Sequence, residues 1–115
     1  MVKNFPKQYK YTLGENIADL GGLIIAFEAY KKSQKGKKPE IIGGFTPEQR
    51  FFVGMAQWAC GDMRPETRRE RAIIDPHSPL EYRVNGVVAN MPEFAAAFSC
   101  KPGQPMVREK ACRVW

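Results

Sequence analysis

Prolines set the positions at which helices of this chain can begin and end. A proline inside a helix removes an amide donor and clashes with the preceding turn, but it is tolerated at the first helical position. The proline-free stretch before Pro39 predicts a helix from about Gly14 to Ser33, ended by Gly36 and Pro39. Its apolar residues recur at helical spacing and predict one buried face, made of Leu13, Ile17, Leu20, Ile24 and Phe27.

A second helix is predicted after a run of capping residues. Thr46 suits the N-cap, Pro47 the first helical position, and Gln49 the third position of a capping box. We expect the helix to continue toward Gly61 and interpret its aromatic residues as core. The predicted apolar surface consists of Phe51, Phe52, Met55, Ala56, Trp58 and Ala59.

Two further prolines end the third predicted helix, which runs from Pro65 to about Ile74. Pro76 and Pro79 prevent this helix from continuing, because each lacks an amide donor and restrains its predecessor. Residues 81–88 alternate and are interrupted by Asn-Gly, a pair typical of turns, so we predict a short extended segment there.

The remaining elements complete a mainly α fold. Asn90 is predicted to cap a short helix with Pro92 near its start, and the tail from Cys100 is predicted to be irregular. Residues 1–10 show no clear period. With 115 residues, 43% hydrophobic and 26% charged, the chain has the size and composition of one small globular piece covering 1–115.

Charge and hydropathy indicate which classes of partner the chain is not expected to have. The longest apolar run, Leu20–Phe27, falls short of the roughly 20 residues that a membrane span needs, so no membrane segment is expected. The net charge of +6 comes mainly from lysines at 31–38 and arginines at 64–71. These clusters lack interleaved aromatic residues and match no recognition motif, so we predict no nucleic-acid partner. A basic helical module that binds nucleic acid stays as an alternative, with a steep salt dependence as its signature.

Glu15 and Asp19 are the first candidate site residues. They lie four positions apart and therefore project from one face of the predicted helix. One carboxylate can bind a cation while the other orients a neighbouring ligand. From the spacing alone, a solvated helix surface is the more common explanation.

The single histidine, His77, lies between Pro76 and Pro79; Asp75 directly precedes Pro76, and Arg83 follows six residues after His77. A lone histidine is usually structural. A loop held by prolines, however, often presents functional groups.

The segment GENIADLGG, residues 14–22, resembles the third-ligand motif of the neprilysin family of zinc metallopeptidases, which includes endothelin-converting enzymes and bacterial oligopeptidases. The resemblance implies that Glu15 is a zinc ligand, completing a site that a His-Glu-x-x-His helix begins upstream. It also implies that Asp19 lies behind Glu15, where it fixes a zinc-bound histidine or serves as proton donor.

A second block, DPHSPLEYRVNG and the sequence after it through the terminal CRVW, is similar to the C-terminus of the same family. The resemblance implies that His77 hydrogen-bonds the oxyanion of the tetrahedral intermediate and that Arg83 holds a backbone carbonyl of the substrate. Preorganised donors of this kind contribute about 3 kcal/mol each to transition-state stabilisation.

The resemblance covers Tyr11 to Trp115 and implies the helical C-terminal part of a zincin-type catalytic domain. Zinc catalysis needs three protein ligands and an open position, and one histidine cannot supply a His-Glu-x-x-His motif. We therefore expect part of a zinc metalloendopeptidase acting on short peptides, with one zinc ion whose other ligands come from the missing N-terminal part. Alone, the chain is predicted to be inactive. The alternative is a non-catalytic remnant that serves as a peptide-binding or regulatory module.

The three cysteines, Cys60, Cys100 and Cys112, have no metal-ligand spacing. In animal members of the family, cysteines at these positions form disulfides with partners much earlier in the chain. The resemblance therefore implies three thiols unpaired within this chain and an extracellular or cell-surface protein, or a periplasmic or cytoplasmic one if bacterial. Three buried, reduced cysteines are the alternative.

Overall fold

The computed structural model describes residues 6–114, with side chains from Tyr11 onward. Within this range the chain forms helices and no strand, so the predicted mainly α class is confirmed. One isolated antiparallel bridge joins Ile42 and Phe45. The helices are α1 (Pro6–Gln34), α2 (Pro47–Trp58), α3 (Pro65–Ile74), α4 (Leu80–Val88) and α5 (Pro92–Ala97).

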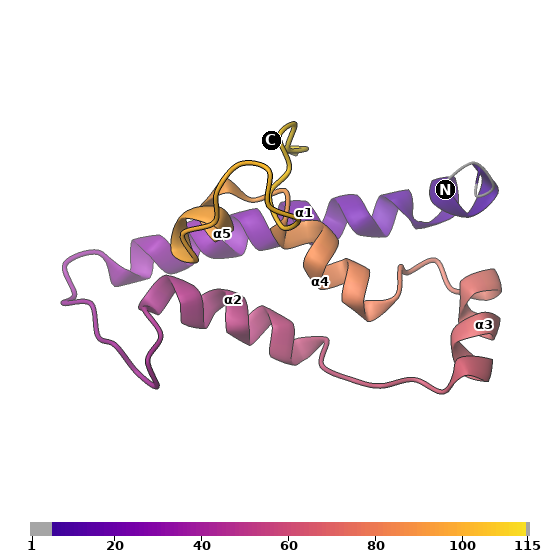
Figure 1. Ribbon diagram of the computed structural model, residues 1–115, viewed down its shortest axis with the longest axis horizontal. Helices are drawn as coiled ribbons and strands as arrows, with labels where there is room; N and C mark the ends of the chain where they lie inside the picture. Colours follow the sequence, from indigo (N-terminus) through magenta and orange to yellow (C-terminus); the bar gives the residue numbers. More distant parts are fainter. Residues whose placement is uncertain (1–5, 115) are drawn as a thin grey trace.

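Helix α1 runs along the long axis of the molecule and carries the other elements (Figure 1). Helix α4 packs against both α1 and α2, and α5 packs against α2. Helix α3 lies at the end of the molecule where α1 begins, joined to its neighbours by two extended loops (Figure 1). This arrangement brings the start of α1, α3 and the start of α4 to the same end.

The core forms where α1, α2 and α4 meet. Phe52 of α2 is 3% exposed, and its ring lies 5.2 Å from that of Phe27 and 5.4 Å from that of Phe94. The other buried residues of this cluster are Leu20, Leu23, Ile24, Val87, Val88 and Met91. The predicted apolar face of α1 is therefore correct from Leu20 onward. Leu13 and Ile17, which lie nearer its start, are each 40% exposed.

The predicted start of α2 is confirmed in detail. The backbone N–H of Gln49 donates to Thr46 Oγ1 at 3.2 Å, and the N–H of Thr46 donates back to Gln49 Oε1 at 2.9 Å. Pro47 occupies the first helical turn. These bonds satisfy amides that the first turn of a helix leaves unpaired. The predicted bounds of α3 are confirmed too.

The prediction of an extended segment at 81–88 was wrong, because these residues form α4. Leu80, Val84, Val87 and Val88 recur at helical spacing, and the last two are buried against the core. Burial of this stripe between α1 and α2 outweighs the strand preference of valine. It also outweighs the turn tendency of Asn85-Gly86, since both residues lie inside the helix.

Two helices begin at residues other than the predicted ones. Helix α1 begins at Pro6 rather than Gly14, so residues 6–10, for which no period was found, are helical; residues 1–5 lie outside the described residues. The N-cap of α5 is Met91, not Asn90. Asn90 instead donates to the Gly86 carbonyl at 2.7 Å and accepts from the Cys112 backbone N–H at 2.9 Å. It thereby ties the irregular tail to α4.

All three cysteines have free thiols. Cys60 and Cys112 are exposed and Cys100 is half-buried, so the interpretation of three buried cysteines is wrong. Between residues 6 and 114 the structure supports no disulfide. None of the described helices is long and apolar enough to cross a membrane.

Candidate functional site

Asp19 of α1 and Arg83 of α4 form the most closely held contact of the site. Arg83 Nε donates to Asp19 Oδ2 and Arg83 Nη2 donates to Asp19 Oδ1, each at 2.7 Å. The two side chains are only 13% and 15% exposed. The hydrogen bonds with Asp19 raise the pKa of Arg83 above its ordinary value. Two residues that lie 64 positions apart are thus fixed in a planar, bidentate pair.

Trp58 supports Arg83 from α2. The guanidinium carbon of Arg83 lies 4.9 Å from the centre of the indole ring, within the range of a cation–π contact. Trp58 is 57% exposed, so its assignment to the core was wrong. It lies at the last residue of α2, outside the aromatic cluster, and its exposed face borders the site.

His77 lies between two carboxylates. Its Nδ1 is 2.8 Å from Asp75 Oδ1, and its Nε2 is 3.2 Å from Glu15 Oε2. Its backbone N–H also donates to Asp75 Oδ1, at 2.9 Å. The pKa of Asp75 is held below its ordinary value, first by this backbone N–H and then by the imidazole. The imidazole and the Glu15 carboxylate are both more than 40% exposed, so this part of the site is open.

The loop that carries His77 is anchored to α1. Ser78 Oγ donates to Asn16 Oδ1 at 2.8 Å, and Tyr11 Oη donates to the Ile74 carbonyl at 3.4 Å. Asn16 and Ser78 lie inside the two recognised blocks, but neither was given a role, because the bond joins residues 62 positions apart. Asp75 was noted beside His77 but was not predicted as a site residue; the Asp-Pro-His spacing was its only signal.

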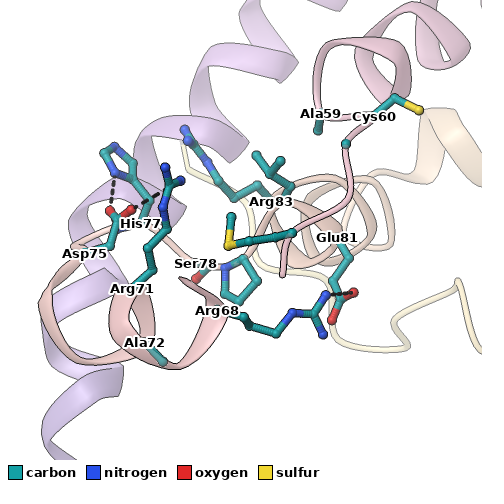
Figure 2. A pocket seen from close by; sticks show the side chains of 14 residues that line it. Ala59, Cys60, Arg68, Arg71, Ala72, Asp75, His77, Ser78, Glu81 and Arg83 are labelled. Carbon is teal, nitrogen blue, oxygen red and sulfur yellow. Dashed lines mark hydrogen bonds and ion pairs between the residues drawn. The ribbon is translucent and has the colours of Figure 1, made fainter. Parts of the chain in front are cut away.

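A cavity of about 340 Å³ lies beside His77 and Arg83 (Figure 2). Its walls come from the loop after α2, one face of α3, the loop 75–79 and the first turn of α4. Glu15 and Asp19 do not line it and instead contact His77 and Arg83 from α1. All four predicted site residues are therefore brought to one end of the molecule, as two contacting pairs.

Whether this chain could bind zinc depends on which of its side chains could coordinate the ion. Among the described residues no group of three or more His, Cys, Asp and Glu side chains is arranged to hold a metal ion. Glu15 offers one partly exposed carboxylate, which suits a single zinc ligand. The residues present therefore fit a share in a zinc centre, and they do not make a complete one.

Comparison with known proteins places this arrangement in one family. The model of peptidase family M13 matches residues 2–114. Neprilysin-1 of Caenorhabditis elegans is 49% identical over 112 residues, covering 92% of this chain and 15% of that protein. Human endothelin-converting enzyme 1 is 43% identical over 119 residues, covering 99% of the chain and 15% of that protein.

Two solved structures also match this chain. The zinc metalloprotease Zmp1 of Mycobacterium tuberculosis, in an open state, matches with a TM-score of 0.88 and 38% identity, over 99% of this chain and 19% of that one. The inhibitor complex of Zmp1 matches 86% of this chain and 15% of that one, with a TM-score of 0.81 and 42% identity. The chain thus spans less than a fifth of the length of these proteins.

Proposed function

Because the chain belongs to peptidase family M13, the neprilysin and endothelin-converting enzyme family of zinc metallopeptidases, we propose that it is the C-terminal portion of a zinc metalloendopeptidase. The reaction is hydrolysis of internal peptide bonds in short peptides. The chain contributes one zinc ligand, Glu15, and the groups that hold the substrate and the developing charge.

One observation carries this proposal: residues from two distant sequence blocks, with complementary proposed roles, contact each other in two pairs. Asp19 and Arg83 make a bidentate contact at 2.7 Å, and Glu15 lies 3.2 Å from His77. If both blocks were ordinary helix surface and loop, no physical reason would align all four side chains. Their convergence supports a common site in the intact protein.

The metal, when bound, would polarise the scissile carbonyl and lower the pKa of a coordinated water. Once Glu15 binds the metal, His77 Nε2, which faces Glu15 at 3.2 Å in this structure, would be freed to donate its N–H to the oxyanion, with Asp75 holding Nδ1. Arg83 has five N–H donors, of which two point to Asp19, and the others are left for a substrate carbonyl. Asp19 therefore acts by orienting Arg83 in addition to the role behind Glu15 that the family resemblance gives it.

The other catalytic groups would come from the missing N-terminal part of the peptidase, which is the proposed partner. The first half of α1 supports this association, because Leu13 and Ile17, one turn apart, are each 40% exposed. A row of apolar side chains on one helix is typical of a surface that another element covers. We propose an extracellular or cell-surface location for this peptidase, or a periplasmic or cytoplasmic one if the protein is bacterial.

A complementation assay tests the function. An M13 relative truncated before the segment that this chain matches supplies the His-Glu-x-x-His helix, and the chain is added to it. Chelator-sensitive cleavage of an internally quenched neutral peptide is expected with the wild-type chain and with Glu28→Gln, a matched exposed glutamate on α1. Glu15→Gln should abolish it.

Two results would contradict the proposal. One is full complementation by Glu15→Gln. The other is zinc-dependent turnover by the chain alone that Glu15→Ala abolishes, because this would mean that the catalyst is complete without a partner.

A non-catalytic peptide-binding module is the second candidate. It is favoured by the fact that the contacts that hold Arg83 come from Asp19 and Trp58, both side chains of this chain. In that case peptide affinity would fall on Arg83→Ala, would not change with zinc, and no complementation would occur.

A further inference from the structure

The cavity beside His77 and Arg83 contains a guanidinium that the proposed chemistry does not use. Arg71 projects from α3 toward Asp75 and His77 (Figure 2). Its closest acidic partner is Asp75 Oδ2, 3.9 Å from Arg71 Nη1, which is too long for a hydrogen bond. The Arg71 side chain is 57% exposed. Its donors are therefore available to a ligand in the cavity.

Asp75 is poorly placed to satisfy Arg71. The other oxygen of its carboxylate, Oδ1, already accepts the backbone N–H of His77 and contacts the imidazole. Arg68, another of the three arginines that line the cavity, makes one contact with Glu81 at 3.3 Å. Each guanidinium has five donors, so both keep most of their hydrogen-bonding capacity.

The rest of the cavity is small and mixed in character, because its wall also includes the carboxylates of Asp75 and Glu81, which face Arg71 and Arg68. Met63, Ala72 and Leu80 contribute carbon surface to its wall. Its volume of about 340 Å³ is near the lower end of ordinary ligand pockets. This suits one short, partly apolar group that ends in a negative charge, and it is too small for a folded partner.

We propose that this cavity is a subsite for a carboxylate of the bound peptide, held by Arg71. The proposal rests on the proposed function, because it takes the ligand to be a peptide lying along His77 and Arg83. A planar guanidinium matches a carboxylate with two parallel hydrogen bonds, which an ammonium group cannot do. The carboxylate is either that of an acidic side chain or the C-terminus of the peptide.

Two pairs of short capped peptides separate these sources. One pair differs only in Glu against Gln, and the other only in a C-terminal carboxylate against an amide. Binding to the full chain is followed by NMR at the backbone amides of Gly61 and Ala72, which line the cavity. In the pair that carries the recognised carboxylate, we expect the charged peptide to bind about fivefold more tightly than its neutral counterpart. This is the upper range for a partly exposed ion pair.

Substitutions on α3 test whether Arg71 causes the preference for a charged peptide. Arg71→Gln should remove it, and Arg71→Lys should keep part of it, since the charge stays and the fork is lost. Arg69→Gln is the matched control, because Arg69 is exposed on the same helix and does not line the cavity. It should leave the preference unchanged.

Three results would overturn the subsite: equal affinities within both pairs, a preference that survives Arg71→Gln, or no change at the cavity amides with any of the four peptides. The complementation assay decides the proposed function separately, because it measures cleavage of a neutral peptide and depends on Glu15. Loss of the carboxylate preference with intact complementation would thus remove the subsite alone.

Discussion

Breaking the pair between Asp19 and Arg83 should destabilise the chain much more than breaking an ordinary surface ion pair. Exposed pairs contribute about 0.2–1 kcal/mol, and removing one partner of a fully buried pair costs about 3–5 kcal/mol. Here the side chains are 13% and 15% exposed and share two short hydrogen bonds. We therefore expect each of Asp19→Asn and Arg83→Gln to lower the free energy of unfolding by about 2–3 kcal/mol.

A double-mutant cycle isolates the pair from its surroundings. Arg83→Gln also loses the contact with Trp58, but this loss is common to the single and the double variant and cancels. Urea unfolding of the four proteins should give a coupling energy of about 2 kcal/mol. A coupling below about 0.5 kcal/mol would refute the reasoning, because it would mean that solvent screens the pair as it screens an exposed one.

Three further outcomes are expected in unfolding experiments. Phe52→Ala should cost about 3–5 kcal/mol, since this 3% exposed ring lies at the centre of the aromatic cluster, whereas Phe45→Ala at a 42% exposed position should cost less than about 1 kcal/mol; comparable losses would contradict the assignment of the core. Thr46→Ala should cost about 1 kcal/mol by removing the cap of α2, and Thr46→Ser should restore most of it; no recovery would refute the capping role. The hydrogen bond from Lys31 is the main cause that holds the pKa of Glu48 below its ordinary value, so the stabilisation by this pair is complete above that ordinary value and is lost as the pH falls through the lowered pKa. Lys31→Met should therefore cost about 0.5 kcal/mol at pH 7 and nothing near pH 2, and a cost that does not change with pH would contradict the ion pair.

Local rules predicted the elements whose boundaries depend on nearby residues. The start of α2 follows from Thr46, Pro47 and Gln49, because all the atoms of the capping box lie within one turn. The bounds of α3 follow from Pro65 and the prolines beyond its end.

Elements that depend on tertiary packing were not predicted. Residues 81–88 have both an alternating pattern and a helical one, and only the packing of Val87 and Val88 against α1 and α2 selects the helix. Trp58 has the apolar character of a core residue, but its position at the end of α2 leaves it exposed beneath Arg83.

The residues of the site could be predicted from the sequence, but the contacts between them could not. Glu15, Asp19, His77 and Arg83 were predicted from motifs. The way they pair depends on how α4 crosses α1, which no single segment encodes. The Asn16–Ser78 bond depends on the same crossing, and the cavity beside α3 depends on how α3 and the loop 75–79 lie against the start of α4, so neither could be predicted from one segment.

The most direct test of the account is the zinc content of the chain alone and of the chain complexed with the truncated relative, measured by elemental analysis after purification without added metal. The isolated chain is expected to hold no stoichiometric zinc, and the complex is expected to hold about one zinc ion. This zinc should be lost with Glu15→Ala and retained with Glu28→Gln. Stoichiometric zinc on the isolated chain, or a complex that keeps its zinc without the Glu15 carboxylate, would contradict the claim that Glu15 completes a shared metal centre.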